Sequence, residues 1–132
     1  MALIIEKKAK RDPLTKKTKF HPSLKSIKKI SEKDVAKAIA DETTLNPKEA
    51  EMVLAQFQKI LLRFLLSGYT VSLSDWASFF LTVTSNGADT EKECTANLIK
   101  GVHAHCRFGK EFREALAKAE FVSAEKFNKK EE

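Results

Sequence analysis

The chain has 132 residues, of which 42% are hydrophobic and 32% are charged, with nine Phe, one Trp and one Tyr. This length and composition indicate one soluble globular domain with a modest core and a tail. No apolar run approaches the ~18 residues of a membrane-spanning helix, so we expect no helix that crosses a membrane. The apolar stretch at Leu3–Ile5 is too short for a secretory signal, so we expect a cytoplasmic protein.

The two cysteines, Cys94 and Cys106, do not make a disulfide framework, and in a reducing compartment we expect free thiols. Cys106 follows His103 and His105, a spacing that raises the alternative of a metal site. In a strand, however, the two histidines lie on one face and Cys106 lies on the other. We therefore expect ordinary strand residues and no bound metal.

Catalytic patterns are missing from the sequence. The chain has only four glycines and no Gly-rich phosphate loop, and it shows no Ser-His-Asp order and no paired-carboxylate cleft. The acidic pairs Asp41–Glu42 and Glu91/Glu93 are better interpreted as solvated surface. We expect a protein that is not an enzyme, with no cofactor and no small-molecule substrate.

The positive charge is concentrated at the N-terminus. Residues 1–33 hold eleven Lys and Arg against three acids, whereas residues 34–132 hold thirteen against fifteen. A basic segment of this kind can follow a polyanion by releasing counterions from its phosphates. A solubilising tail is the alternative, and charge alone does not separate the two.

The N-terminal segment has the composition of an arm. Residues 2–5 can form a short strand, because Leu3, Ile4 and Ile5 favour strands. Residues 6–29 are rich in Lys, contain Pro13 and Pro22, and lack periodicity. They predict a flexible or extended arm, and we expect residues 1–30 to be a basic extension.

Two helices follow. Ser31 is a good N-cap for a helix that runs to about Thr43, with acids in its first turn. Asn46 and Pro47 open a second helix, which continues to Ser67 and ends at Gly68.

The second helix is apolar nearly all round, so it must be buried on several sides. One short helix and a small sheet of the same chain cannot cover it, whereas a second copy of the chain can. The sequence therefore predicts an intertwined homodimer. We expect its core to contain Phe57, Ile60, Leu61, Phe64 and Leu65 from this helix, with Phe79 and Leu81 from the sheet.

After Gly68 the hydrophobic period becomes two. Residues 69–73 and 78–83 predict two strands around a tight turn at 74–77, and residues 99–108 predict a third strand beyond a turn at Asn86–Gly87. Phe80 points away from the apolar face and needs a partner, which can be the arm, the partner subunit or a base. Residues 112–119 predict a final helix, and we expect residues 123–132 to be a charged tail.

This order of elements resembles the HU/IHF family of bacterial histone-like DNA-binding proteins over roughly residues 31–121. Val71–Phe79 is similar to the family segment V-x-L-x-x-F-G-x-F, and Arg107–Arg113 resembles K-P-G-K-x-L-K. Residues 85–91 resemble the subgroup with a basic N-terminal extension. The resemblance implies an α+β fold over residues 31–122: two helices, a three-stranded antiparallel sheet with a short hairpin arm, and a C-terminal helix.

The sequence departs from the family pattern at several positions. Trp76, Ala77 and Phe108 stand where Phe, Gly and Pro are usual. If that Gly takes a positive φ, we expect either a strained Ala77 or an altered turn. The arm motif R-x-N-P-x-T-G is missing, and residues 85–100 carry three acids against Lys92 and Lys100. In the family the proline of that motif wedges between base steps. Strong wedge-type bending is therefore not expected here.

The resemblance and the charge together imply a nucleoid-associated protein that binds and condenses double-stranded DNA without sequence specificity. Arg107, Lys110 and Arg113 match the family segment, and cations near a helix N-terminus suit phosphate oxygens, although a solvated surface cluster is the alternative. The remaining candidate DNA-binding residues are Lys100, His103, His105, Lys16, Lys17, Lys19, Lys28 and Lys29. The alternative function is a protein–protein interaction module on the same fold, with weak or lost DNA binding.

Overall fold

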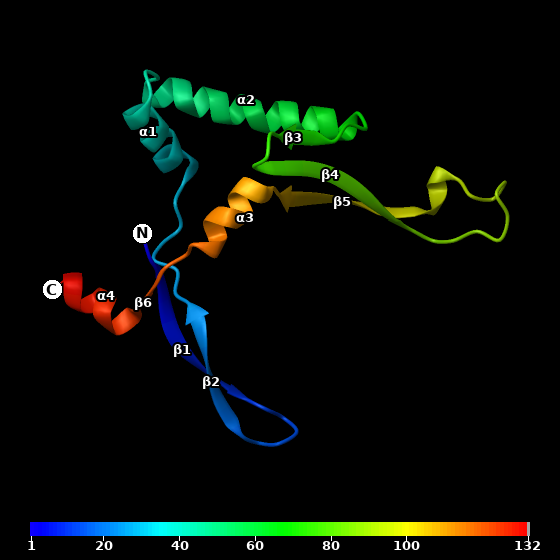
Figure 1. Cartoon of the computed structure of the whole chain (residues 1–132). Helices are drawn as coiled ribbons and strands as arrows, with labels where there is room; N and C mark the ends of the chain where they lie inside the picture. The colour runs from blue at the N-terminus through cyan, green and yellow to red at the C-terminus, as the bar shows by residue number, and fades with distance from the viewer. Residues whose placement is uncertain (132) are drawn as a thin grey trace. The chain divides into compact units, whose positions relative to one another are not determined.

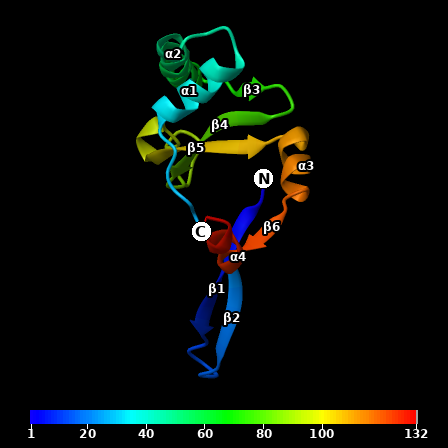
Figure 2. The same ribbon diagram turned by 90° about the vertical axis from the view of Figure 1, so that its left-hand side faces the viewer.

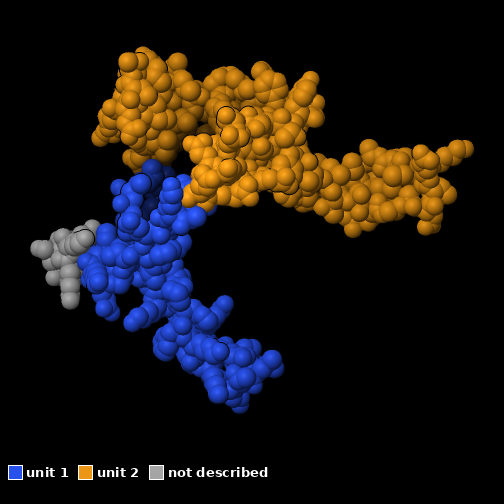
Figure 3. Space-filling view, viewed as in Figure 1, with its two compact units in different colours: residues 1–30, 115–132 blue, residues 31–114 orange. Residues whose placement is uncertain are grey.

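The computed structural model describes residues 1–131, with side chains to residue 128. It comprises two compact units, Ser31–Glu114 and a second unit that joins Met1–Ile30 to Ala115–Glu132 (Figures 1 and 3). The second unit thus combines both ends of the chain. The sequence instead predicted a separate N-terminal extension up to residue 30 and a separate C-terminal tail after residue 122. Among the described residues, no helix is both long and apolar enough to cross a membrane.

The two predicted helices are confirmed, together with their caps. Helix α1 (Glu32–Glu42) starts with a capping box, in which the Ser31 hydroxyl accepts from the Asp34 amide and the Asp34 carboxylate accepts from the Ser31 amide. Helix α2 (Pro47–Leu66) starts at Asn46, whose side-chain oxygen accepts from the Glu49 amide at 2.8 Å. These caps explain why both helices begin where the sequence predicted.

Helix α2 is terminated by Gly68, which follows the C-cap Ser67, has a φ of 92° and so provides the left-handed conformation that glycine allows. Within one chain most of the apolar surface of α2 is uncovered. Only Ala50 and Leu65 are buried along this helix, while Phe57 and Phe64 keep 37% and 42% of their surface exposed. Exposed Met52, Val53, Leu62 and Leu66 extend this surface.

The first sheet has the predicted three antiparallel strands, in the order β3 (Val71–Leu73), β4 (Ala77–Ser85) and β5 (Ile99–Phe108). Strands β4 and β5 form a long hairpin that extends away from the helices of its own unit (Figure 1). Its loop, residues 86–98, is longer than the tight turn expected at Asn86–Gly87 and includes a short 3₁₀ helix, Ala96–Leu98.

Ala77 is not strained, so the first of the two alternatives expected at this position is wrong. It is the first residue of β4, it is 1% exposed, and its φ is not positive. The left-handed residue of this turn is instead Ser74, with a φ of 56°, and the Trp76 amide closes the turn on the Leu73 carbonyl at 3.1 Å. The left-handed residue of this turn therefore lies three positions before Ala77, the position where the family carries Gly.

Helix α3 (Lys110–Ala117) begins directly after Gly109, at the end of β5. The Gly109 amide donates to the Trp76 carbonyl at 2.7 Å, and a Cβ at this position would overlap the Asp75 carbonyl. Phe112 then packs on Phe108 and edge-on against Trp76, with ring centroids 4.2 and 5.6 Å apart. These rings fix the start of α3 against the turn that precedes β4.

The N-terminal segment is not the flexible or simply extended arm that the sequence predicted. Strands β1 (Leu3–Arg11) and β2 (Thr18–Leu24) pair as an antiparallel hairpin from Ile5↔Leu24 to Arg11↔Thr18. Pro22 is compatible with a strand here because β2 is at the edge of its sheet, where proline is tolerated.

The C-terminal residues are also ordered, in contrast to the predicted charged tail. Strand β6 (Phe121–Ser123) pairs in parallel with β1, and helix α4 (Ala124–Glu131) follows it and packs on both strands (Figure 2). The pairing buries Ile4 to 4% exposure and forms a second sheet, β2-β1-β6. The prediction of a charged tail was wrong because β6 forms only by pairing with β1, a strand from the opposite end of the sequence.

Candidate nucleic-acid interface

One face of the β4–β5 ladder is polar and carries three of the predicted site residues. The register places Arg107 opposite Ser78, His105 opposite Phe80, and His103 opposite Thr82. Because side chains alternate along a strand, all of these project from the same face. The other face carries Phe79, Leu81 and Val83 against Cys106, Ala104 and Val102, as predicted from the period of two.

Diagonal contacts hold both histidines of this face in place. The Thr82 hydroxyl and His105 Nε2 are 2.7 Å apart, and the Thr84 hydroxyl and His103 Nε2 are also 2.7 Å apart. In each pair the imidazole either donates or accepts, according to its tautomer. The threonines thus fix the orientation of each imidazole ring through its Nε2 atom.

Phe80 packs on its own sheet, a partner that the sequence did not anticipate. Its ring stacks on His105, with centroids 5.3 Å apart and an interplanar angle of 19°. The Arg107 guanidinium carbon lies 5.5 Å from the centroid of the same ring. An aromatic ring, which carries no charge, therefore restricts the Arg107 side chain and leaves its positive charge available to an external anion.

The two other matched cations lie on α3. Lys110 is the first residue of this helix and Arg113 is one turn further, while the Arg113 amide closes the first helical bond on Gly109. Lys110 is 3.8 Å from Glu114, but both side chains are more than half exposed, so this ion pair is weak. Both cations thus remain on the surface of the same unit as the polar face.

Lys100 is at a different kind of position. The ladder shifts register between Thr84 and Ser85, so Lys100 has no directly opposed residue on β4. The adjacent loop, residues 86–98, carries Asp89, Glu91 and Glu93 against Lys92. The far end of the hairpin is therefore acidic.

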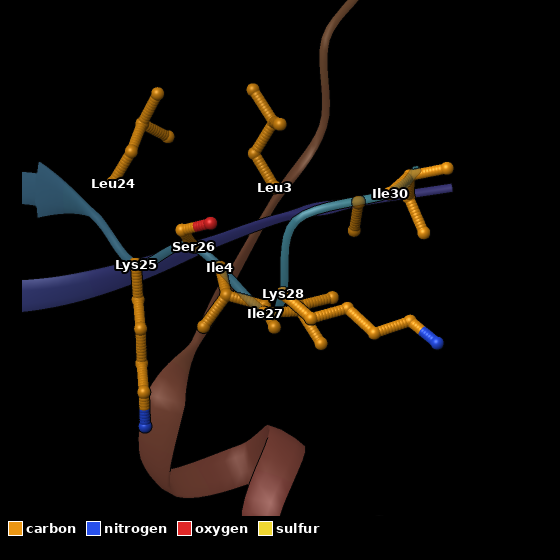
Figure 4. Close-up of a pocket in the computed structure, with 9 residues that line it drawn as sticks. Leu3, Ile4, Leu24, Lys25, Ser26, Ile27, Lys28 and Ile30 are labelled. Carbon is orange, nitrogen blue, oxygen red and sulfur yellow. The ribbon is translucent and has the colours of Figure 1, made fainter. Parts of the chain in front are cut away.

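The N-terminal lysines belong to the other compact unit. Lys16, with a φ of 57°, and Lys17 form the tip of the β1–β2 hairpin, and Lys19 is in β2. Lys28 and Lys29 follow the hairpin, and Lys28 lines an apolar hollow together with Leu3, Ile4 and Ile27 (Figure 4). The structure thus divides the predicted cations into two separate sets.

Sequence reasoning missed several residues of these surfaces. Thr82 and Thr84 orient the histidines, and their alternation along β4 was the available signal. Lys8, Lys10 and His21 lie on one face of the β1–β2 hairpin, which could not be inferred while this segment was interpreted as an arm. Among the described residues, no group of three or more His, Cys, Asp or Glu is arranged to hold a metal ion.

Comparison with known proteins gives a family and a fold. The family of HU domains fused to a winged helix-turn-helix, immunoglobulin or glycine-rich motif matches residues 3–123. A crystal structure from Bacteroides vulgatus, provisionally described as a bacterial DNA-binding protein, superposes with a TM-score of 0.61 at 11% identity. The alignment covers 92% of this chain and 48% of that one, so this chain spans about half of its neighbour's length.

No curated protein matches the sequence. The family match covers nearly the whole chain and agrees with the observed helix pair, three-stranded sheet and following helix. The chain therefore belongs to the HU-HIG family of HU domains fused to further modules.

Proposed function

We propose that this protein binds double-stranded DNA without sequence specificity, as a homodimer, and helps to organise the nucleoid. One observation carries the proposal: the polar face of β4 and β5 presents Arg107, His105 and His103 with no acidic side chain opposite them in the ladder. Membership of an HU-domain family and the description of the structural neighbour support it.

The chemistry of this face suits phosphate rather than base recognition. Arg107 provides a planar, permanently charged donor, and the histidines and threonines add hydrogen-bonding groups in a row along the hairpin. Lys110 and Arg113 add cations at the start of α3. Phosphate contacts fix position on a duplex and carry no sequence information, so we infer binding without base preference.

The proposed dimer follows from the uncovered surface of α2. Phe57, Ile60, Leu61 and Phe64 form an apolar surface of which only part is covered by their own chain, and Leu65 is buried. Such a surface in water favours association with a second copy. We infer that α2 and the apolar face with Phe79 and Leu81 form the dimer core.

We propose that this binding does not bend DNA strongly. Residues 86–98 contain no proline, and their three acids repel phosphates. The loop therefore lacks the apolar wedge with which minor-groove proteins unstack base steps. If Asp89, Glu91 and Glu93 instead bind a protein, duplex affinity will be weak, which is the outcome expected of an interaction module.

A salt titration tests the proposal. Affinity for a 30-base-pair duplex should fall steeply with salt. Each phosphate that the protein neutralises adds about 0.9 to the slope, so Arg107→Gln should reduce the slope by about 2 per dimer. Arg63→Gln is the matched control, because Arg63 also lies over a phenylalanine ring, at 5.7 Å from the Phe64 centroid. Absence of duplex binding at low salt, or an equal reduction in both variants, would contradict the proposal.

A further inference from the structure

The β1–β2 hairpin presents two different faces. Its register pairs Lys8 with His21 and Lys10 with Lys19, and these four residues share one face of the ribbon. The opposite face is mixed, since it carries Lys7 and Arg11 among Ala9 and Phe20, with Ile5, Pro22 and Leu24. Strand pairing, which a flexible tail lacks, therefore brings Lys8, Lys10 and Lys19 together on one face, while the other face combines cations with apolar side chains.

The basic face is exposed and has little internal compensation. Lys8, Lys10, Lys19 and His21 are all exposed. Glu6 shares their face at the base of the hairpin and is 3.9 Å from Lys8, with the lysine side chain 64% exposed. An ion pair this long and this exposed contributes little, so the face keeps its positive charge.

The cross-strand pair Lys10↔Lys19 points to an anionic partner. Directly opposed residues of an antiparallel pair have Cβ atoms about 5 Å apart, and like charges at this distance destabilise the hairpin. An external anion between the two ammonium groups would reverse the sign of this interaction. Neither lysine has an acidic side chain opposite it in the register.

The tip of the hairpin has its own fixed structure. The Asp12 carboxylate accepts from the Leu14 amide at 2.9 Å and from the Thr15 hydroxyl at 3.0 Å. The Lys16 amide donates to the Asp12 carbonyl, and the Asp12 amide donates to the Lys17 carbonyl. The Asp12 oxygens therefore stabilise the turn, and Lys16 and Lys17 extend the positive charge to the tip.

We propose that the basic face of the β1–β2 hairpin, formed by Lys8, Lys10, Lys19 and His21, is a second DNA-binding surface that takes the phosphates of a duplex. This inference rests on the proposed function, and it assigns the hairpin the role of a folded ribbon. Residues 6–19 hold seven Lys and Arg against two acids, whereas the β4–β5 loop is acidic. Of the two hairpins, the N-terminal one has the charge for a DNA arm.

The dimensions of the hairpin fit this role. Seven paired residues per strand, at about 3.3 Å each, give a ribbon roughly 20 Å long. The major groove of B-DNA, about 12 Å wide, admits a two-stranded ribbon between its phosphate walls. Lysines on both strands can then reach phosphates along the same stretch of duplex.

Two variants of the full chain separate a folded ribbon from a flexible cationic tail. K8Q/K10Q/K19Q removes three cations, and its matched control K33Q/K37Q/K48Q removes three lysines from α1 and α2. We expect the first to lower the salt slope of duplex binding by at least about 2 more than the control, because each neutralised phosphate contributes about 0.9 to the slope. Affinity in 0.1 M salt should fall on the order of 100-fold.

The second variant keeps the composition and moves the charge. K8A/A9K/T18K/K19T exchanges neighbouring residues, so that two lysines pass from the basic face to the opposite face of the ribbon. We expect at least tenfold weaker binding than wild type, with the hairpin amides still protected from hydrogen exchange. If the exchanged variant binds like wild type while R107Q is impaired, the inference is wrong and the proposed function stands. If wild type does not bind duplex, both fail.

Discussion

Replacing Phe57 by Ser should dissociate the proposed dimer without unfolding the protomer. Phe57 is near the middle of α2 and is 37% exposed within one chain. A phenylalanine side chain presents roughly 200 Å² of surface, so about 75 Å² remains for a partner to cover. At about 25 cal/mol per Å², this area contributes about 2 kcal/mol per protomer.

Both protomers carry the substitution, so the dimer should lose about 4 kcal/mol, which raises its dissociation constant on the order of 1,000-fold. Sedimentation equilibrium across protein concentration measures this constant, and circular dichroism verifies that the helices persist. Gln58→Ser is the matched control, because it introduces the same residue at the next, exposed position of α2. A wild-type mass that stays monomeric at every concentration, or identical behaviour of F57S and Q58S, would refute the reasoning.

Three other perturbations test single interactions. Gly109→Ala should destabilise the protein by about 1–3 kcal/mol in a urea titration, because the new Cβ overlaps the Asp75 carbonyl and the backbone must move. Asn46→Ala should cost about 1 kcal/mol in the same assay, through loss of the α2 cap; no change would show that this cap is dispensable. Hydrogen bonds from the Leu14 amide, and to a lesser extent from the Thr15 hydroxyl, lower the pKa of Asp12 below its usual 3.8. The ionised carboxylate therefore stabilises the hairpin tip above pH 3.8, and this stabilisation is lost as the pH falls through the lowered pKa. Hydrogen-exchange protection of the Lys16 amide should follow that loss in wild type and should be pH-independent in Asp12→Ala.

The helices and the β3-β4-β5 sheet were predictable because their signals are local. Ser31 and Asn46 cap the helices that follow them, and the alternation over residues 99–108 predicted β5 with its observed bounds. The same alternation placed His103, His105 and Arg107 on one face. Elements whose structure depends on neighbouring residues could thus be inferred from the sequence.

The β2-β1-β6 sheet was not predictable because its signals are distributed along the whole chain. Pro22 suggested a break, yet proline at the edge of a sheet leaves no ladder bond unmade. Leu3 pairs with Phe121, a neighbour that no local pattern identifies. The stacking of Phe80 on His105 likewise depends on the exact register of two strands, which alternation alone does not fix.

The parallel pairing of β1 with β6 has a consequence for folding. Residues 31–114 are continuous in sequence and pack on one another, so this unit can fold as soon as it has been synthesised. The unit that contains β1 must wait for β6, and closing a loop over most of the chain costs conformational entropy and time. Throughout that interval Ile4, which β6 and α4 later help to bury, has no cover, and the unpaired edge of β1 is open to strand exchange with another nascent chain.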